Sequence, residues 1–435
     1  MDMDPESITH RKALELNLDP TKYGTFAEIG AGQEVADWFL SVGGASGTVA
    51  QTICAYDKAF SDERYGPGTR YVSRERLLTM LEREYQTLET QLRAARGSQV
   101  RFFAFADTVA AKSFKGDNEQ HGWIGLRFQA ASGSAPSDIL LHVALRDHEV
   151  EQQRTALGIL GVNLVHAAYR QPPAPEPFLR ALFENLSIER LEIDVIELDG
   201  PAFTGQDARL WCVEALRQGI ARAVLLDTSG KPEQPSTLLR KRALVVEGRV
   251  RHTDSGNSAP LVSAAIAQLR REEKLEAEPL LLLDVRLADL ATSGLEGAAL
   301  GEWLRSLASR GPVVLTEHPM LYPVVEYLRR YTSHPVRVLA SSAILARLVS
   351  ETYAALPGTL LESLGKLLVQ NLRLYIHPVS SEVFLREMQA SHLERVGAVE
   401  SARSIGLDEL RCAAPLDHLV RYLRGAGWIV PLEIR

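Results

Sequence analysis

Cysteine is scarce in this sequence, and its three copies lie far apart. Cys54, Cys212 and Cys412 form no C-x-x-C pair, and their odd number does not suit a disulfide framework. We therefore expect no structural zinc site and a reducing compartment. No apolar run reaches the roughly 18 residues of a membrane-spanning helix. The acidic, polar start MDMDPESITHRKALELNLDP lacks the apolar stretch of a signal peptide, so we expect a cytoplasmic protein with no membrane partner.

The sequence also lacks an excess of positive charge and the common catalytic motifs. The 435 residues carry a formal net charge of -7 and no basic cluster, so we expect no nucleic-acid partner. The histidines form no H-x-x-x-H or H-E-x-x-H pattern, which predicts no metal site, and G-x-S-x-G is absent, which leaves a nucleophilic serine unsupported. The apolar share of 46% is typical of a globular protein.

The first part of the sequence predicts an α+β domain over residues 1–170. Ser73 is a suitable N-cap for a long amphipathic helix that follows it. Three strand-like runs come next, at Val100–Phe105, Gly122–Gln129 and Ile139–Leu145. A turn-rich loop joins the last two, so we expect an antiparallel hairpin within a small antiparallel sheet.

The rest of the sequence predicts a second domain of a different kind. Prolines crowd residues 171–178, and we interpret this stretch as a linker. From 179 to 435, short strands rich in valine, leucine and isoleucine alternate with amphipathic helices, beginning with the strand LEIDVIEL. That alternation predicts βαβ units and a Rossmann-like, mostly parallel sheet, and so an α/β protein overall. In such sheets the carboxyl ends of the strands line the ligand crevice, and Asp227 and Asp284 follow or lie within two of these strands.

A glycine-rich stretch between residues 25 and 50 is the most unusual local feature. Its first part, FAEIGAGQEV, has an acid and a G-x-G after an apolar strand, as a cofactor-binding turn does. We therefore take two groups as candidate cofactor-binding residues: Glu28 with Gly30 and Gly32, and Gly43 with Gly44 and Gly47. The alternative is that the glycines only permit tight turns or close packing.

Charged side chains are dense in the same domain and supply candidate catalytic residues. Asp57 and Lys58 follow the glycines, Asp107 follows the strand FFAFA, and His121 begins the strand GWIGLRF. A histidine and an aspartate could share general acid–base work, and a lysine could neutralise a phosphate or carboxylate. The alternative for each is an ordinary cap, loop or surface ion pair. We expect these residues to meet around the glycines if the domain holds an active site.

The sequence resembles a bacterial family of soluble proteins that has no settled function. The resemblance rests on LDPTKYGTFAEIGAGQEVADWF, GGASGTVAQTICAYDKAFSDERYG, FFAFADTVAAKSFKG and HGWIGLRFQ, and it extends through most of the chain. Members carry inconsistent labels, nicotinate-nucleotide (or nicotinamide mononucleotide) adenylyltransferase and TonB-dependent receptor. The H-x-G-H or T-x-G-H loop of that transferase class is absent here, as is the strand alternation of a barrel receptor. The resemblance therefore assigns no catalytic residue.

Three functions remain open at this point. The first is a cytoplasmic enzyme, such as a transferase, that acts on a nucleotide-like or phosphorylated small molecule through the N-terminal glycines and charged residues. The second is a non-catalytic interaction protein, a homo-oligomer in which the glycines permit close subunit packing. The third is an S-adenosylmethionine-dependent methyltransferase, which requires Glu28–Gly32 to lie between a parallel strand and a helix.

Overall fold

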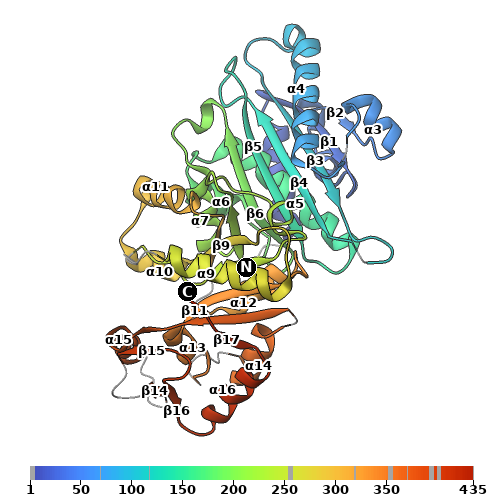
Figure 1. The fold of residues 1–435 in the computed structure, drawn as a ribbon. Helices are drawn as coiled ribbons and strands as arrows, with labels where there is room; N and C mark the ends of the chain where they lie inside the picture. The colour runs from blue at the N-terminus through green and yellow to red at the C-terminus, as the bar shows by residue number, and fades with distance from the viewer. Residues whose placement is uncertain are drawn as a thin grey trace. The chain divides into compact units, whose positions relative to one another are not determined.

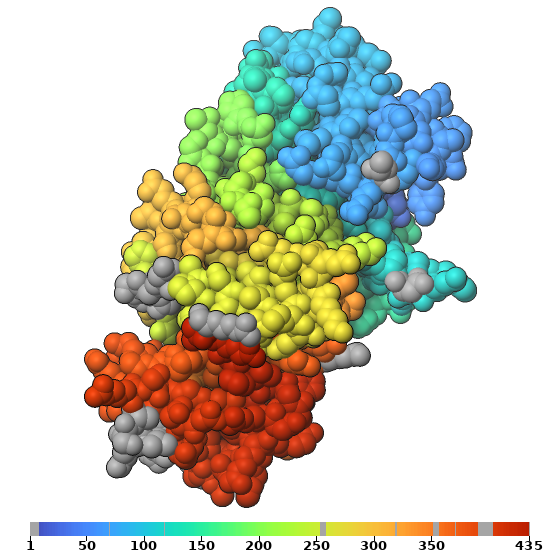
Figure 2. Space-filling view, viewed as in Figure 1, coloured from blue at the N-terminus to red at the C-terminus, as the bar shows by residue number. Residues whose placement is uncertain are grey.

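The structure is a computed structural model. It describes residues 5–68, 70–116, 118–252, 258–317, 320–350, 356–369, 371–390, 396–398 and 403–434. The chain divides into two compact units, Met1–Val224 and Leu225–Arg435. In Figures 1 and 2 the first unit is blue to green, and the second runs from yellow-green to red. Within the described part of the chain, no helix has the length and apolar character needed to cross a membrane.

A six-stranded mixed sheet forms the centre of the first unit, in the order β2-β1-β3-β4-β5-β6. Its strands are Lys22–Ile29 (β1), Val49–Ile53 (β2), Arg101–Ala110 (β3), His121–Phe128 (β4), Ser137–Leu145 (β5) and Leu191–Asp199 (β6). Strand β1 pairs in parallel with β2 and β3, whereas β3 to β6 pair antiparallel. The carboxyl ends of β1, β2 and β3 therefore share one edge of the sheet.

Helices cover both faces of this sheet (Figure 1). The helices of the first unit are Pro5–Asn17 (α1), Glu34–Ser41 (α2), Lys58–Tyr65 (α3), Arg74–Arg96 (α4), Val150–Arg170 (α5), Pro175–Leu182 (α6) and Ala208–Arg217 (α7), with short 3₁₀ turns at Ala45–Gly47 and Pro201–Phe203. Side chains alternate between faces along a strand. Ala104 packs in the core beneath α4, while Phe26 meets Phe39 of α2 on the other face, with ring centroids 4.8 Å apart.

A seven-stranded sheet forms the centre of the second unit, in the order β17-β12-β11-β8-β9-β10-β7. Its strands are Ala223–Leu226 (β7), Leu244–Glu247 (β8), Leu280–Arg286 (β9), Val313–Thr316 (β10), Val336–Ser341 (β11), Leu372–His377 (β12) and Ile429–Pro431 (β17). The pairs from β17 to β10 are all parallel. Two small antiparallel pairs join Val379–Ser380 (β13) to Ser404–Ile405 (β15) and Val396–Ala398 (β14) to Leu410–Cys412 (β16).

The helices of the second unit connect these strands. They are Pro235–Leu239 (α8), Ala259–Glu273 (α9), Leu287–Ser293 (α10), Gly297–Ala308 (α11), Tyr322–Arg329 (α12), Ser342–Leu348 (α13), Thr359–Leu367 (α14), Ser381–Ala390 (α15) and Leu416–Gly425 (α16). Helix α9 packs through Ala265 and Leu269 on Val245 of β8 and Leu339 of β11. The predicted α/β class and the mostly parallel sheet are confirmed.

Three expectations from the sequence need correction. The division between units falls after Val224 rather than at residues 171–178, which follow the end of α5 at Arg170 and contain the start of α6. The strand LEIDVIEL belongs to the first sheet, because β6 pairs antiparallel with β5. That sheet is also larger than the predicted antiparallel one, since the parallel strands β1 and β2 extend it. The three predicted strands and the Ser73 cap, which accepts the Arg76 N–H, are confirmed.

Candidate functional site

Glu28 and Asp107 lie side by side at the carboxyl edge of the first sheet. They are register partners on β1 and β3, so both point to the face covered by α2 and α5, and each is only 2% exposed. The Glu28 carboxylate accepts the backbone N–H groups of Val35 and Ala36, both at 2.9 Å, in the first turn of α2. Asp107 accepts the N–H of Ile29 at 3.1 Å. This is a buried pair of acids.

Burial and proximity raise the pKa of both acids. Burial raises the pKa of Glu28 to about 7, against the two backbone N–H bonds that lower it. Burial, with the charge of Glu28, raises the pKa of Asp107 well above its ordinary value. Glu28 is the group that ionises first, because a helix N-terminus stabilises its charge. Asp107 then keeps its proton near neutral pH.

Cys54 follows β2 at the same edge of the sheet. Its pKa is raised by partial desolvation of the thiol and by the neighbouring acids Asp107 and Glu28. The thiol is therefore protonated near neutral pH, and it lacks the thiolate character of a cysteine nucleophile.

The first glycine cluster serves the packing of the chain. Gly30 has φ +106°, and a Cβ there would lie 1.9 Å from the carbonyl oxygen of Val109. Gly32 has φ +97°, and a Cβ there would lie 2.9 Å from Nε of Arg154. The anion site that a helix N-terminus offers is already filled, because the Glu28 carboxylate occupies the start of α2.

The second glycine cluster lies at the opposite edge of the sheet. Gly43, Gly44 and Gly47 follow the end of α2 and precede β2, whose first residue pairs with the start of β1. Gly44 and Gly47 face the carbonyl oxygen of Asn17, at 3.3 and 3.1 Å from the position a Cβ would take. In a parallel βαβ unit, the loop after the first strand and the loop before the second strand lie at opposite ends of the strands. The first glycine cluster is in one of these loops and the second is in the other, so the two clusters do not form one site.

Asp57 and Lys58 follow β2 and begin α3. Asp57 caps this helix by accepting the N–H of Ala59 at 2.8 Å. Nζ of Lys58 lies 5.4 Å from the ring centroid of Tyr71. Thr108 donates a hydrogen bond to the Tyr71 carbonyl at 2.6 Å, which places Tyr71 near the carboxyl end of β3. Both predicted residues are exposed, and the ordinary cap and surface interpretation accounts for their contacts.

His121 does not pair with Asp107 as the sequence suggested. Asp107 is opposite Ile124 and His121 is opposite Ala110, three positions further along β3. An odd separation puts the two side chains on opposite faces of the sheet. The sequence could not reveal that the two side chains lie on opposite faces, because both residues lie near the ends of neighbouring strands and only the strand register decides the face.

His121 instead ends a chain of polar groups across three strands. Its Nδ1 lies 3.0 Å from Nε2 of His142 on β5, and Nδ1 of His142 lies 2.5 Å from Oδ1 of Asp194 on β6. The pairing of β5 with β6 shifts next to His142, and Asp194 falls at this bulge. A bulge redirects a side chain, here a buried aspartate toward a buried histidine.

A different sheet edge, in the second unit, is placed to bind a ligand. The chain passes from β8 to β9 and β10 on one side, and then returns to β11 and β12 on the other side of β8. The strand order therefore reverses between β8 and β11. In open parallel sheets, ligands bind at the carboxyl ends of the strands at such a switch point.

A crevice of about 380 Å³ lies at this switch point. This size falls within the range of small-molecule sites, about 300–1,000 Å³. The charged and aromatic residues of its wall are Glu247, Arg249, Arg251, His252, Trp303, Arg310, His377 and Glu387. Ser258, which immediately precedes α9, also lines it, so a helix N-terminus faces the same space.

The arginines of the crevice are held by acids. Arg310 contacts Glu247 at 2.8 Å and the Ser258 hydroxyl at 2.7 Å. Arg249 makes two contacts with Asp289, both at 3.0 Å. These contacts orient the guanidinium groups at the wall of the crevice.

His377, at the end of β12, supplies an acid–base group to the crevice. Burial lowers the pKa of His377, so the ring is neutral near pH 7. Its Nδ1 lies 3.1 Å from the carbonyl oxygen of Pro378, which can only accept a hydrogen bond, so the proton is on Nδ1. Nε2 then carries a free electron pair, as a general base requires.

The sequence did contain a signal for this crevice. The run Gly248-Arg249-Val250-Arg251-His252 directly follows the apolar strand Leu244–Glu247, where polar residues at a strand end indicate a site. What the sequence did not supply is the strand order that makes the end of β8 a switch point.

Comparisons with known proteins give weak similarities. No protein-family model and no curated protein matches this chain. Among solved structures, competence/damage-inducible protein CihA from Agrobacterium tumefaciens is 19% identical, over 39% of this chain and 97% of that protein, with a TM-score of 0.27. A CinA superfamily protein from Klebsiella pneumoniae is 10% identical, over 38% and 96%, with a TM-score of 0.28. A competence or damage-inducible protein from Enterobacter asburiae is 9% identical, over 38% and 99%, with a TM-score of 0.29. Similarities of this size establish neither fold nor activity.

Proposed function

We propose that this protein is an enzyme that acts on a nucleotide-like or phosphorylated small molecule bound in the crevice of the second unit. The observation that carries the proposal is the set of arginines around a crevice at the switch point between β8 and β11. Guanidinium groups match the geometry of phosphate oxygens, and the N-terminus of α9 adds a favourable dipole. In the first unit, the start of α2 that the sequence suggested as an anion site is already occupied by Glu28.

An aromatic pair supports a nucleotide-like ligand in particular. His252 and Trp303 both line the crevice, and their rings meet edge to face with centroids 5.8 Å apart. Aromatic faces of this kind stack on nucleobases. His377 supplies the proton-accepting group that a reaction at the crevice would need.

A thermal-shift screen against nucleotides, NAD precursors and S-adenosylmethionine tests the proposal. A ligand at 100 times its Kd stabilises a protein by about 2.7 kcal/mol, which such a screen detects. We expect a phosphorylated compound to stabilise the protein, and Trp303→Ala and Arg310→Gln to reduce that shift. Arg271→Gln is the matched control, because Arg271 pairs with Glu433 and is not among the residues that line the crevice.

Two results would overturn this proposal. One is the lack of any shift with every phosphorylated compound. The other is a shift that Trp303→Ala and Arg310→Gln leave unchanged, since the ligand would then bind elsewhere.

S-adenosylmethionine belongs in the screen because one condition for a methyltransferase is met. Glu28–Gly32 lies between the parallel strand β1 and helix α2. The self-assembly alternative has less support, because Gly30, Gly32, Gly44 and Gly47 pack against residues of their own chain. Size-exclusion chromatography distinguishes a monomer from an oligomer.

A further inference from the structure

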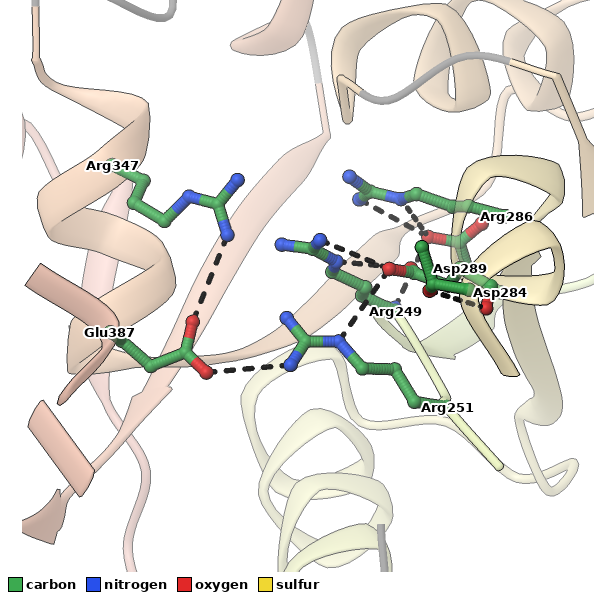
Figure 3. A network of polar contacts seen from close by, with 8 residues as sticks. Arg249, Arg251, Asp284, Arg286, Asp289, Arg347 and Glu387 are labelled. Carbon is green, nitrogen blue, oxygen red and sulfur yellow. Dashed lines mark hydrogen bonds and ion pairs between the residues drawn. The ribbon is translucent and has the colours of Figure 1, made fainter. Parts of the chain in front are cut away.

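An ion-pair network joins the two walls of the crevice (Figure 3). Arg249 and Arg251 stand on the side of β8, near Asp289 of α10. Glu387 of α15 and Arg347 of α13 stand on the other side. The contact that crosses between the walls joins Nη1 of Arg251 to Oε1 of Glu387 at 3.3 Å.

Glu387 differs from Asp289, another acid of this network, in how it is held. Asp289 receives two contacts of 3.0 Å from Arg249, in the paired geometry of a strong ion pair. Each Glu387 oxygen instead makes one longer contact, Oε1 with Arg251 at 3.3 Å and Oε2 with Arg347 at 3.8 Å. Its side chain is 24% exposed. Contacts of this length near solvent are weak, so another anion can displace this carboxylate.

We propose that Arg251 and Arg347 form the subsite for the anionic group of the ligand, and that Glu387 fills this subsite when no ligand is bound. A phosphate monoester can place one oxygen toward each guanidinium, as Glu387 now does, and it carries more negative charge than a carboxylate. The subsite therefore selects ligands with a terminal phosphate over their neutral counterparts. The inference rests on the proposed function and specifies the ligand group and the residues that bind it.

Isothermal titration with adenosine monophosphate and with adenosine tests this inference. Glu387→Gln removes the competing charge and keeps the side-chain size, so we expect adenosine monophosphate to bind about two- to fivefold more tightly, the effect of losing one partly exposed ion pair. Adenosine should bind the variant and the native protein equally. Arg347→Gln should weaken binding of the monophosphate, because one of the two guanidinium groups is lost.

Glu433→Gln is the matched control, because it removes the same charge from the ion pair that Glu433 makes with Arg271, outside the crevice lining. An equal gain in Glu387→Gln and Glu433→Gln would show a general charge effect and would refute the inference. Equal binding of adenosine monophosphate by the native protein and Glu387→Gln would also refute it, while the proposed function would stand. If no phosphorylated compound binds the native protein or Glu387→Gln, the proposed function fails and the inference fails with it.

Discussion

Asp107→Asn tests whether the first unit really holds a protonated aspartate. In the native structure, burial raises the pKa of Asp107 well above its ordinary value, and the charge of Glu28 adds to this where Glu28 is ionised, whereas in the unfolded chain Asp107 ionises above about pH 4. The folded state therefore binds one more proton than the unfolded state above that pH, and the native protein loses stability as pH rises. Asparagine has the same shape and does not ionise, and its oxygen can still accept the Ile29 N–H.

The size of the effect follows from one proton. The free energy of unfolding of Asp107→Asn, minus that of the native protein, should grow by about 1.4 kcal/mol per pH unit above pH 4. The growth should stop where Asp107 ionises in the folded state. A change in unfolding free energy of about 1.4 kcal/mol per pH unit greatly exceeds the effect of an ordinary surface substitution, about 0.5 kcal/mol.

Urea denaturation followed by tryptophan fluorescence measures this difference between pH 4 and 8. Phenylalanine at Trp303 and Trp428 removes the fluorescence of the second unit, so the remaining tryptophans report the first unit alone. Asp57→Asn is the control, because Asp57 is exposed and asparagine caps a helix equally well. If the stability of Asp107→Asn and of the native protein changed in parallel across this pH range, Asp107 would be ionised in the folded state and the reasoning would be wrong.

The other predictions concern single positions and are measured by urea denaturation. Gly30→Ala should destabilise the first unit by more than about 2 kcal/mol, because Gly30 has a positive φ and lies against a carbonyl oxygen. Gly43→Ala should change stability by less than about 0.5 kcal/mol, because a Cβ at Gly43 meets no atom within 4 Å. Equal effects of the two substitutions would contradict the packing role of Gly30. Asp194→Ala should cost about 1–3 kcal/mol by leaving the buried Nδ1 of His142 without its Asp194 partner, and a cost near zero would count against the polar chain. Burial lowers the pKa of His377, so below about pH 6.5 the unfolded state binds more protons than the folded state. The free energy of unfolding of the native protein therefore decreases as the pH falls below about 6.5, and His377→Asn should make this decrease smaller.

The elements of this fold were readable from the sequence, but their partners were not. Alternating apolar runs predicted the strands, and Ser73 predicted the start of α4, because these patterns depend on neighbouring residues alone. The strand LEIDVIEL was predicted correctly and assigned to the wrong sheet. Its pairing with β5 connects residues about 50 positions apart, and the apolar pattern is the same for either partner.

At the candidate site, too, the sequence indicated residues but not which of them come together. Glu28 and Asp107 were both predicted as site residues near the ends of strands, and the structure brings them together because β1 and β3 are register partners. His121 was chosen by the same rule, and the alternation of the strands sends it to the other face. Asp194 reaches His142 through a bulge, which no pattern of the single sequence indicates.

Two glutamates of this chain occupy places where a ligand anion could bind, and their surroundings separate them. Glu28 is 2% exposed and accepts two backbone N–H groups at 2.9 Å, which belong to the first turn of α2. A ligand phosphate would have to displace this carboxylate into the core, where an unpaired charge costs several kcal/mol, on the order of 3–5.

Glu387 is held much less tightly than Glu28. Its contacts are single and longer, its partners are side chains, and its side chain is 24% exposed, so it loses little when it turns outward. The same residue type therefore occupies one anion site through fixed backbone N–H groups and, in our proposal, leaves the other open to exchange. This difference, rather than the glycine-rich sequence, is what places the proposed ligand in the second unit.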